Sequence, residues 1–193
     1  HLLFAGGKRL RPLLMLLCAR LCGRSDADTV RFSTIFEYLH AATLLHDDVV
    51  DEADQRRGRV VANQRWGNAL AVLAGDFCLA RALTEIAQTG QVEAVASLAQ
   101  TVQEMAEGEV IQLNHRGHLD LSEETYYAVL DRKTASLIAW CARVGGLLPA
   151  TSDRALERYG RALGIAFQIA DDILDYQGDA QVTGKSIGTD LRE

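Results

Sequence analysis

The sequence predicts an all-α protein, and its composition and patterning support this in three ways. Hydrophobic residues make up 48% of the 193 residues, only two residues are proline, and alanine and leucine are plentiful. Most of the chain repeats its apolar residues with the spacing of a helix rather than with the alternation of a strand. A chain of this length fits one domain and can bury a substantial core. We therefore treat residues 1–193 as a single helical domain, and we expect that domain to continue past both ends of the chain.

The expected helix boundaries follow from caps and helix breakers. Pro12 suits the first turn of a helix, where its missing N–H costs no hydrogen bond. Ser25 or Asp26 can cap the next helix, and Asp120 with Glu123 has the spacing of a capping box. The expected helices span about 13–21, 27–52, 68–88, 92–114, 120–144 and 151–176, with a polar loop at 54–59 and a short connector at 63–67.

Three aspartates end the second helix, at Asp47, Asp48 and Asp51. On a helix Asp47 and Asp51 lie about 40° apart on one face, with Asp48 beside them. Two bare carboxylates about 4 Å apart repel by roughly 4 kcal/mol at an effective dielectric constant of 20. Such a cluster therefore calls for cations, and an oxygen-only donor set favours Mg²⁺, Mn²⁺ or Ca²⁺ over Zn²⁺. His40 lies two turns earlier on the same face, which makes it a candidate site residue.

The same spacing recurs on the last helix, at Asp171, Asp172 and Asp175. One such triplet alone is more simply a solvated helix end. Two triplets, each embedded in apolar sequence, favour a pair of facing motifs that hold divalent ions at the mouth of a helical bundle.

Basic residues are placed where they could surround such a cluster. Lys and Arg side chains with free backbone N–H groups at a helix start form a natural diphosphate seat. Cations bridge carboxylate to phosphate, and the apolar helices below could bind a hydrocarbon tail, so the pattern predicts a ligand with a diphosphate head and an apolar tail. Metal ions would stabilise a leaving diphosphate, and dry apolar walls would protect a carbocation. The basic residues concerned are Lys8, Arg11, Arg56, Arg57, Lys133 and Lys185.

Several other classes are disfavoured. The formal net charge is −6, and no basic tract suggests nucleic acid as a partner. No apolar run is long enough to span a membrane, and no signal peptide is evident. The cysteines lack the spacing of a metal site, so we expect free thiols in a reducing cytoplasm. The sequence shows no P-loop motif and no Ser-His-Asp or activated Cys arrangement.

Taken together, the motifs resemble those of the trans-polyprenyl diphosphate synthases, nearest to the octaprenyl and other long-chain members. The resemblance covers essentially the whole chain. It rests on residues 6–12 (GGKRLRP), 45–51 (LHDDVVD) with 56–58 (RRG), 75–77 (GDF), 133–135 (KTA), 167–175 (FQIADDILD), and 184–185 (GK) with Gly188 and Asp190.

The resemblance implies an all-α isoprenoid-synthase bundle around a deep central cavity, usually a homodimer, that condenses isopentenyl diphosphate with an allylic diphosphate. It also implies a cluster of about three Mg²⁺ ions, with Mn²⁺ as an alternative. It implies catalytic roles for Asp47, Asp51, Asp171, Lys133 and Lys185. By the same resemblance, the metal ligands are Asp47, Asp51, Asp171 and Asp175, with Asp48 and Asp172 in support. Isopentenyl diphosphate is held by Lys8, Arg11, His40 and Arg57. The allylic diphosphate, for which farnesyl diphosphate is the expected primer, is held by Arg56, Lys133, Thr134, Gln168 and Lys185.

Product length can be argued from the residues just before the first motif. Ala42 and Thr43 are small, so they leave room for a growing chain, whereas a bulky aromatic residue at this level stops growth early in the family. We therefore expect a long product, with Val102 or Met105 as the floor of the tube, and a shorter product from Ala42→Phe.

One departure from the family pattern is that the basic residue expected just after residues 190–193 (DLRE) is absent.

Three other functions remain open. A class I terpene cyclase needs the metal motif but not a second diphosphate site, so intact Lys8, Arg11 and Arg57 argue against it. A non-catalytic subunit of a heteromeric prenyl synthase would lose aspartate motifs, and both are complete. A plain metal-binding bundle would not explain the basic residues.

Overall fold

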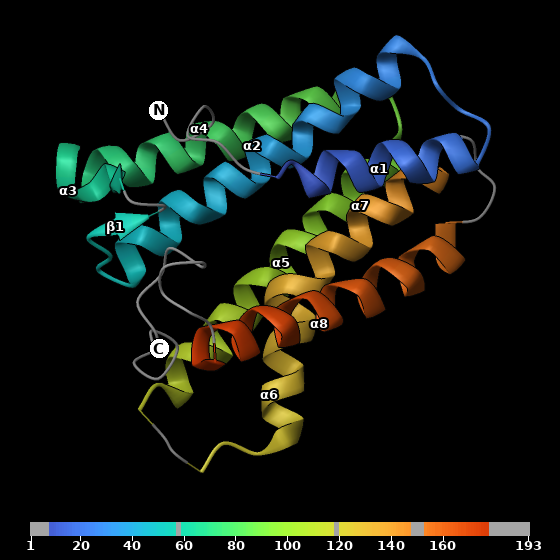
Figure 1. Cartoon of the computed structure of the whole chain (residues 1–193). Coiled ribbons are helices and arrows are strands. Elements are labelled where there is room, and N and C mark those ends of the chain that lie inside the picture. Colours follow the sequence, from blue (N-terminus) through green and yellow to red (C-terminus); the bar gives the residue numbers. More distant parts are fainter. Residues whose placement is uncertain (1–7, 57–58, 118–119, 148–152, 178–193) are drawn as a thin grey trace. The chain divides into compact units, whose positions relative to one another are not determined.

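The computed structural model describes residues 8–56, 59–117, 120–147 and 153–177, and it confirms the all-α prediction (Figure 1). Apart from one two-stranded ladder, the regular elements in these ranges are helices. Backbone contacts group the chain into two compact units, His1–Val95 and Ala96–Glu193, which are described in turn.

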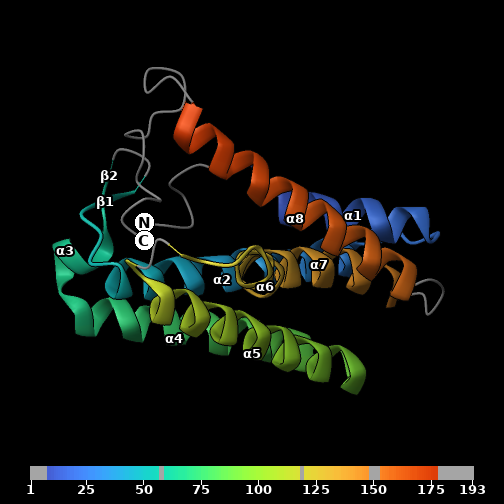
Figure 2. The same ribbon diagram turned by 90° about the horizontal axis from the view of Figure 1, so that it is seen from below.

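The first unit is built on the long helix α2 (Ala27–Val50), which packs against α1 (Leu10–Leu21) and α4 (Asn68–Ala87). Figures 1 and 2 both show α2 and α4 side by side. Asp26 caps α2, because its carboxylate accepts hydrogen bonds from the Thr29 hydroxyl and backbone N–H, each at 2.7 Å. These bonds, with a further one from Arg24, lower the pKa of Asp26 to about 2. The core between the helices is fully buried and apolar, and it includes Ile35 and Phe36.

The segment after α2 differs from the expected loop and connector. Strands β1 (Gln55–Arg56) and β2 (Arg59–Val60) form an antiparallel ladder that begins in the expected polar loop and ends one residue past it. The short helix α3 (Ala62–Trp66) covers most of the expected connector. Buried Asn63 on α3 donates a hydrogen bond of 2.9 Å to the backbone oxygen of Asp48, which fixes α3 against the end of α2. Polar composition alone does not reveal such a long-range bond.

The second unit contains nearly all of α5 (Val92–His115), then α6 (Glu123–Val129), η1 (Leu130–Ala135) and α7 (Ser136–Leu147) without a break, and finally α8 (Asp153–Gln177) (Figure 1). The η1 segment is one turn of π-helix, a local feature that is frequent at functional sites. Ser122, rather than the expected Asp120, caps α6, since its hydroxyl accepts from the Thr125 backbone N–H at 3.1 Å. The expected capping residues before α8 lie outside the described residues.

Glycines let α8 approach η1 and α7 closely. A Cβ atom at Gly164 would lie 2.6 Å from the Cα atom of Ala135, and one at Gly160 would lie 2.8 Å from the Cα atom of Ala139. Gly108 on α5 is similar, because a Cβ there would lie 2.7 Å from the backbone nitrogen of Lys133. The π-helical turn is therefore packed between α5 and α8 at backbone distance.

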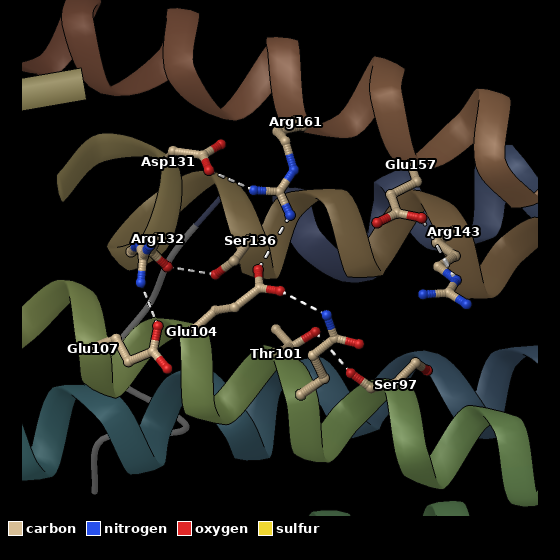
Figure 3. A network of polar contacts seen from close by, with 11 residues as sticks. Ser97, Thr101, Glu104, Glu107, Asp131, Arg132, Ser136, Arg143, Glu157 and Arg161 are labelled. Atoms are coloured by element: carbon tan, nitrogen blue, oxygen red, sulfur yellow. Dashed lines mark hydrogen bonds and ion pairs between the residues drawn. The ribbon is translucent and has the colours of Figure 1, made fainter. Parts of the chain in front are cut away.

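Charged side chains tie the same three elements together (Figure 3). Arg161 on α8 binds Asp131 on η1 at 2.7 Å and Glu104 on α5 at 3.1 Å. Burial lowers the pKa of Arg161, but the hydrogen bonds to both carboxylates outweigh it and raise the pKa above its ordinary value. Arg132 pairs with Glu107 in the same network. Glu104 and Glu107 of α5 are thus both engaged in ion pairs with arginines of the second unit.

The four cysteines are free, as expected. Burial raises the pKa of Cys18, with a further contribution from nearby Cys22, and burial also raises the pKa of Cys78. None of the described helices has the length and apolar character needed to cross a membrane.

Candidate functional site

The first aspartate motif occupies the last turns of α2, where its three carboxylates have different surroundings. Asp47 and Asp51 are half-buried, and Asp51 is the C-cap residue that follows α2, four residues after Asp47. Asp48 is 0% exposed, and its Oδ1 atom accepts a hydrogen bond of 2.7 Å from Nε of Arg56 on β1. A buried carboxylate needs such a partner, since removing one member of a buried pair leaves an uncompensated charge. Asp48 is thus the buried residue of the motif, and its hydrogen bond orients the Arg56 side chain.

A second close contact lies one residue before the motif. The His46 ring sits against Gly75 on α4, where an added Cβ would lie 2.3 Å from Nε2. That nitrogen is 3.3 Å from the Val72 backbone oxygen and 3.3 Å from Oδ1 of Asp76. The Asp76 side chain itself is 60% exposed. Gly75 is therefore required by the approach of His46.

Three of the four residues expected to bind isopentenyl diphosphate lie in the described part of the chain. Lys8 is exposed and Arg11 is half-buried in the first turn of α1, so the positive end of the helix adds to their charge. His40 is half-buried on α2. Arg57 lies outside the described residues, as does Lys185 of the allylic set.

One of the two residues proposed to set chain length has different surroundings from those expected. Ala42 is 4% exposed and packs with Ala41, Leu45 and Cys78 in the core between α2 and α4. A larger side chain at position 42 would therefore meet these neighbours, and its effect on product length stays a prediction. Thr43 is half-buried, and its hydroxyl donates to the His40 backbone oxygen at 3.0 Å.

The second unit contains three residues expected to bind the allylic diphosphate, of which Thr134 and Gln168 contact each other. Lys133 and Thr134 belong to η1, and the Thr134 hydroxyl donates to Oε1 of Gln168 on α8 at 2.9 Å. The Lys133 ammonium lies 2.6 Å from Oε2 of Glu109 and donates to Oε1 of Gln112 at 3.0 Å. Sequence reasoning missed both α5 residues, although their spacing of three places them on one helix face.

The second aspartate motif joins this network through its middle carboxylate. Asp172 accepts hydrogen bonds from Nε2 of Gln168 at 2.8 Å and from the hydroxyl of Tyr126 at 2.6 Å. Asp171 is half-buried and Asp175 is 6% exposed. Tyr126 was also missed, although it precedes Lys133 by seven residues, which is about two helical turns.

The donor set fits a magnesium ion that is shared with a phosphate ligand. Each motif offers carboxylate oxygens only, which suit a hard cation. Within the ranges that the structure describes, no three His, Cys, Asp or Glu side chains converge as a complete cation site. Mg²⁺ is commonly held by one or two carboxylates, substrate phosphates and water rather than by an all-protein cage. Carboxylates from one motif, beside basic side chains, meet that requirement.

Comparisons with known proteins bear on the family and the fold of the chain. The sequence model of the polyprenyl synthetase family matches residues 1–193. The octaprenyl diphosphate synthase of Escherichia coli is 42% identical over 196 residues, which cover 100% of this chain and 61% of that protein. The nonaprenyl diphosphate synthase of Mycobacterium tuberculosis is 43% identical over 100% of this chain and 58% of its own length.

A solved structure gives the same result for the fold. The polyprenyl synthase from Caulobacter crescentus, crystallised with calcium and isoprenyl diphosphate, superposes with a TM-score of 0.92 at 43% identity. The match covers 97% of this chain and 58% of that protein. The chain thus spans about three fifths of the length of the relatives that it matches.

Proposed function

The chain belongs to the polyprenyl synthetase family, and we propose that its protein is a prenyltransferase. It condenses isopentenyl diphosphate with an allylic diphosphate, farnesyl diphosphate in the first instance, to give a long-chain all-trans polyprenyl diphosphate. The observation that carries this proposal is the chain of contacts from Thr134 to Gln168 and from Gln168 to Asp172, with Lys133 next to Thr134 on η1. Cationic and amide donors next to carboxylates suit a diphosphate that carries metal ions.

The metal-binding residues are Asp47 and Asp51 on α2 and Asp171 and Asp175 on α8. Asp48 and Asp172 support them from within the protein, where each accepts hydrogen bonds from neighbouring side chains. Mg²⁺, with Mn²⁺ as an alternative and about three ions in the full site, supplies the Lewis acidity that stabilises charge on a departing diphosphate.

The protein side chains orient the two substrates and stabilise developing charge. Lys133, Thr134, Gln168, Arg56 and Lys185 hold the allylic diphosphate, which leaves with the electron pair of the broken C–O bond. The double bond of isopentenyl diphosphate attacks the resulting carbocation, and the product then loses a proton. Lys8, Arg11, His40 and Arg57 hold the diphosphate of that second substrate.

A long product is supported by the small side chain of Thr43 and by the two long-chain synthases among the relatives described above. Thr43 lies one turn before Asp47 on α2, and Val102 and Met105 are half-buried on α5. We propose that the growing chain passes Thr43 and ends at Val102 or Met105.

A homodimer is supported by an exposed apolar face on α4. Leu70, Leu73 and Phe77 are exposed at helical spacing along it. Contiguous apolar surface of this kind is typical of a protein interface, and a second copy is the proposed occupant. Leu73→Glu should convert a dimer to a monomer in light scattering after gel filtration. The four free cysteines support a reducing, cytoplasmic location.

The test is incorporation of labelled isopentenyl diphosphate by the full-length protein, with farnesyl diphosphate and Mg²⁺, and with products separated by length. Long prenyl products are expected from the wild type, and Asp47→Ala should lower the rate by at least about 100-fold. The control is Asp28→Ala, at an exposed aspartate near the other end of α2. No incorporation, while metal and diphosphate still bind, would refute the synthase and favour a cyclase or a non-catalytic subunit.

A further inference from the structure

Tyr126 contacts the second aspartate motif, although the mechanism above gives it no task. It is half-buried on α6, and its hydroxyl donates a 2.6 Å hydrogen bond to Oδ2 of Asp172, 46 residues away in the sequence. A hydrogen bond to a charged acceptor is stronger than a neutral one. Tyr127, the next residue, is 41% exposed and meets Tyr126 edge to face, with ring centroids 5.6 Å apart.

The bond from Tyr126 completes the support of Asp172. Nε2 of Gln168, one turn earlier on α8, donates to the other oxygen, Oδ1. One donor thus comes from the helix that carries Asp172 and the other from α6. Two donors on different oxygens fix the plane of the carboxylate, whereas Gln168 alone would leave it free to rotate about its Cβ–Cγ bond.

The fixed carboxylate in turn orients the side-chain amide of Gln168. An ionised carboxylate can only accept hydrogen bonds, so the NH₂ group of Gln168 must face Asp172. Its oxygen then faces Thr134, whose hydroxyl donates to it at 2.9 Å. Of the two N–H bonds of the amide, Asp172 uses one, and the second remains as a donor for a phosphate oxygen.

We propose that Tyr126 is a positioning residue for the allylic diphosphate, acting through Asp172 on Gln168. The proposal rests on the proposed function. Tyr126 itself does not touch substrate in this scheme, because its hydroxyl proton is committed to Asp172. Loss of the Tyr126 hydroxyl should therefore weaken the binding of the allylic diphosphate and of its metal ions. It should leave the binding of isopentenyl diphosphate unchanged.

The experiment compares Tyr126→Phe with the matched control Tyr127→Phe, each of which removes one hydroxyl. In Tyr126→Phe the KM for farnesyl diphosphate should rise about tenfold, the order expected for losing a hydrogen bond to a charged group. The KM for isopentenyl diphosphate should stay within about twofold of the wild-type value in both variants. Binding of Mn²⁺ with inorganic pyrophosphate, followed by the electron paramagnetic resonance of free Mn²⁺, should weaken by a similar factor in Tyr126→Phe alone.

A double-mutant cycle tests the route through Gln168. In a Gln168→Ala background, Tyr126→Phe should raise the KM for farnesyl diphosphate by less than about twofold, since the group being oriented is absent. The proposal is overturned if Tyr126→Phe matches Tyr127→Phe in both assays. It is also overturned if the variant only lowers kcat and melting temperature while both KM values stay constant. If the wild type neither incorporates labelled isopentenyl diphosphate nor binds Mn²⁺ in the presence of pyrophosphate, the proposed function is overturned. This inference then fails with it.

Discussion

Gly164→Ala should separate the effect of helix position from that of helix stability. The added Cβ would lie 2.6 Å from Cα and 2.9 Å from Cβ of Ala135, so α8 and η1 would have to move apart by about 0.8 Å to reach an ordinary contact of 3.4 Å. Overpacking of this kind costs about 1–3 kcal/mol, and alanine in a helix returns about 1 kcal/mol relative to glycine. The free energy of unfolding should therefore fall by about 1 kcal/mol.

The larger effect should be on activity, because Gln168 lies one turn further along α8 and accepts from Thr134 across the same gap. A misplacement of about 1 Å in a substrate-positioning group can lower the rate about 100-fold. We expect kcat/KM for farnesyl diphosphate to fall by about 10- to 100-fold, measured by incorporation of labelled isopentenyl diphosphate.

The control is Ala162→Gly, at an exposed position of the same helix. It should lower the free energy of unfolding by about 1 kcal/mol through helix propensity alone and should leave kcat/KM unchanged. The reasoning fails if Gly164→Ala is about 1 kcal/mol more stable than the wild type and fully active, because propensity would then explain the substitution without any displacement.

Three further predictions concern other parts of the structure. Replacing Arg161 with methionine should lower the free energy of unfolding, measured in urea, by about 1–3 kcal/mol, because Asp131 and Glu104 lose their counter-charge. The control, Arg158→Met at an exposed position of α8, should change this free energy little. Equal effects of the two substitutions would contradict a stabilising role for the Arg161 ion pairs. Ala42→Phe should lower the melting temperature by overpacking the core, and Thr43→Phe should shorten the product in a chain-length assay; a stable Ala42→Phe enzyme with short products would reverse these assignments. The stabilisation from ionised Asp26 should be complete above pH 4 and lost as the pH falls through about 2, since its pKa is lower in the folded than in the unfolded chain. Asp26→Asn retains a capping oxygen and should lose less stability over that pH range. Identical acid unfolding of the wild type and Asp26→Asn would refute this prediction.

The helices and the two aspartate motifs could be predicted from the sequence because both depend on local order. Apolar spacing, caps and the absence of proline determine where a helix forms, and a spacing of four places Asp47 and Asp51 on one face in any tertiary structure. Most helix boundaries agree with the structure to within a few residues. The start of α6 differs because Ser122 rather than Asp120 caps it, and helix α3 and the β1–β2 ladder were not expected at all.

The family resemblance, in turn, named Lys133, Thr134 and Gln168 in advance. It did so from motif residues and not from geometry.

The partners of these residues were decided by the tertiary structure. The pairing of Asp48 with Arg56, of Lys133 with Glu109 and of Asp172 with Tyr126 depends on how far each helix is rotated and how closely it approaches its neighbour. Close approach depends on glycines whose need is invisible without the facing backbone. The core position of Ala42 follows in the same way from the packing of α4 on α2. The sequence by itself therefore determined which chemical groups the protein carries on each helix, and packing between helices decided which of these groups contact one another.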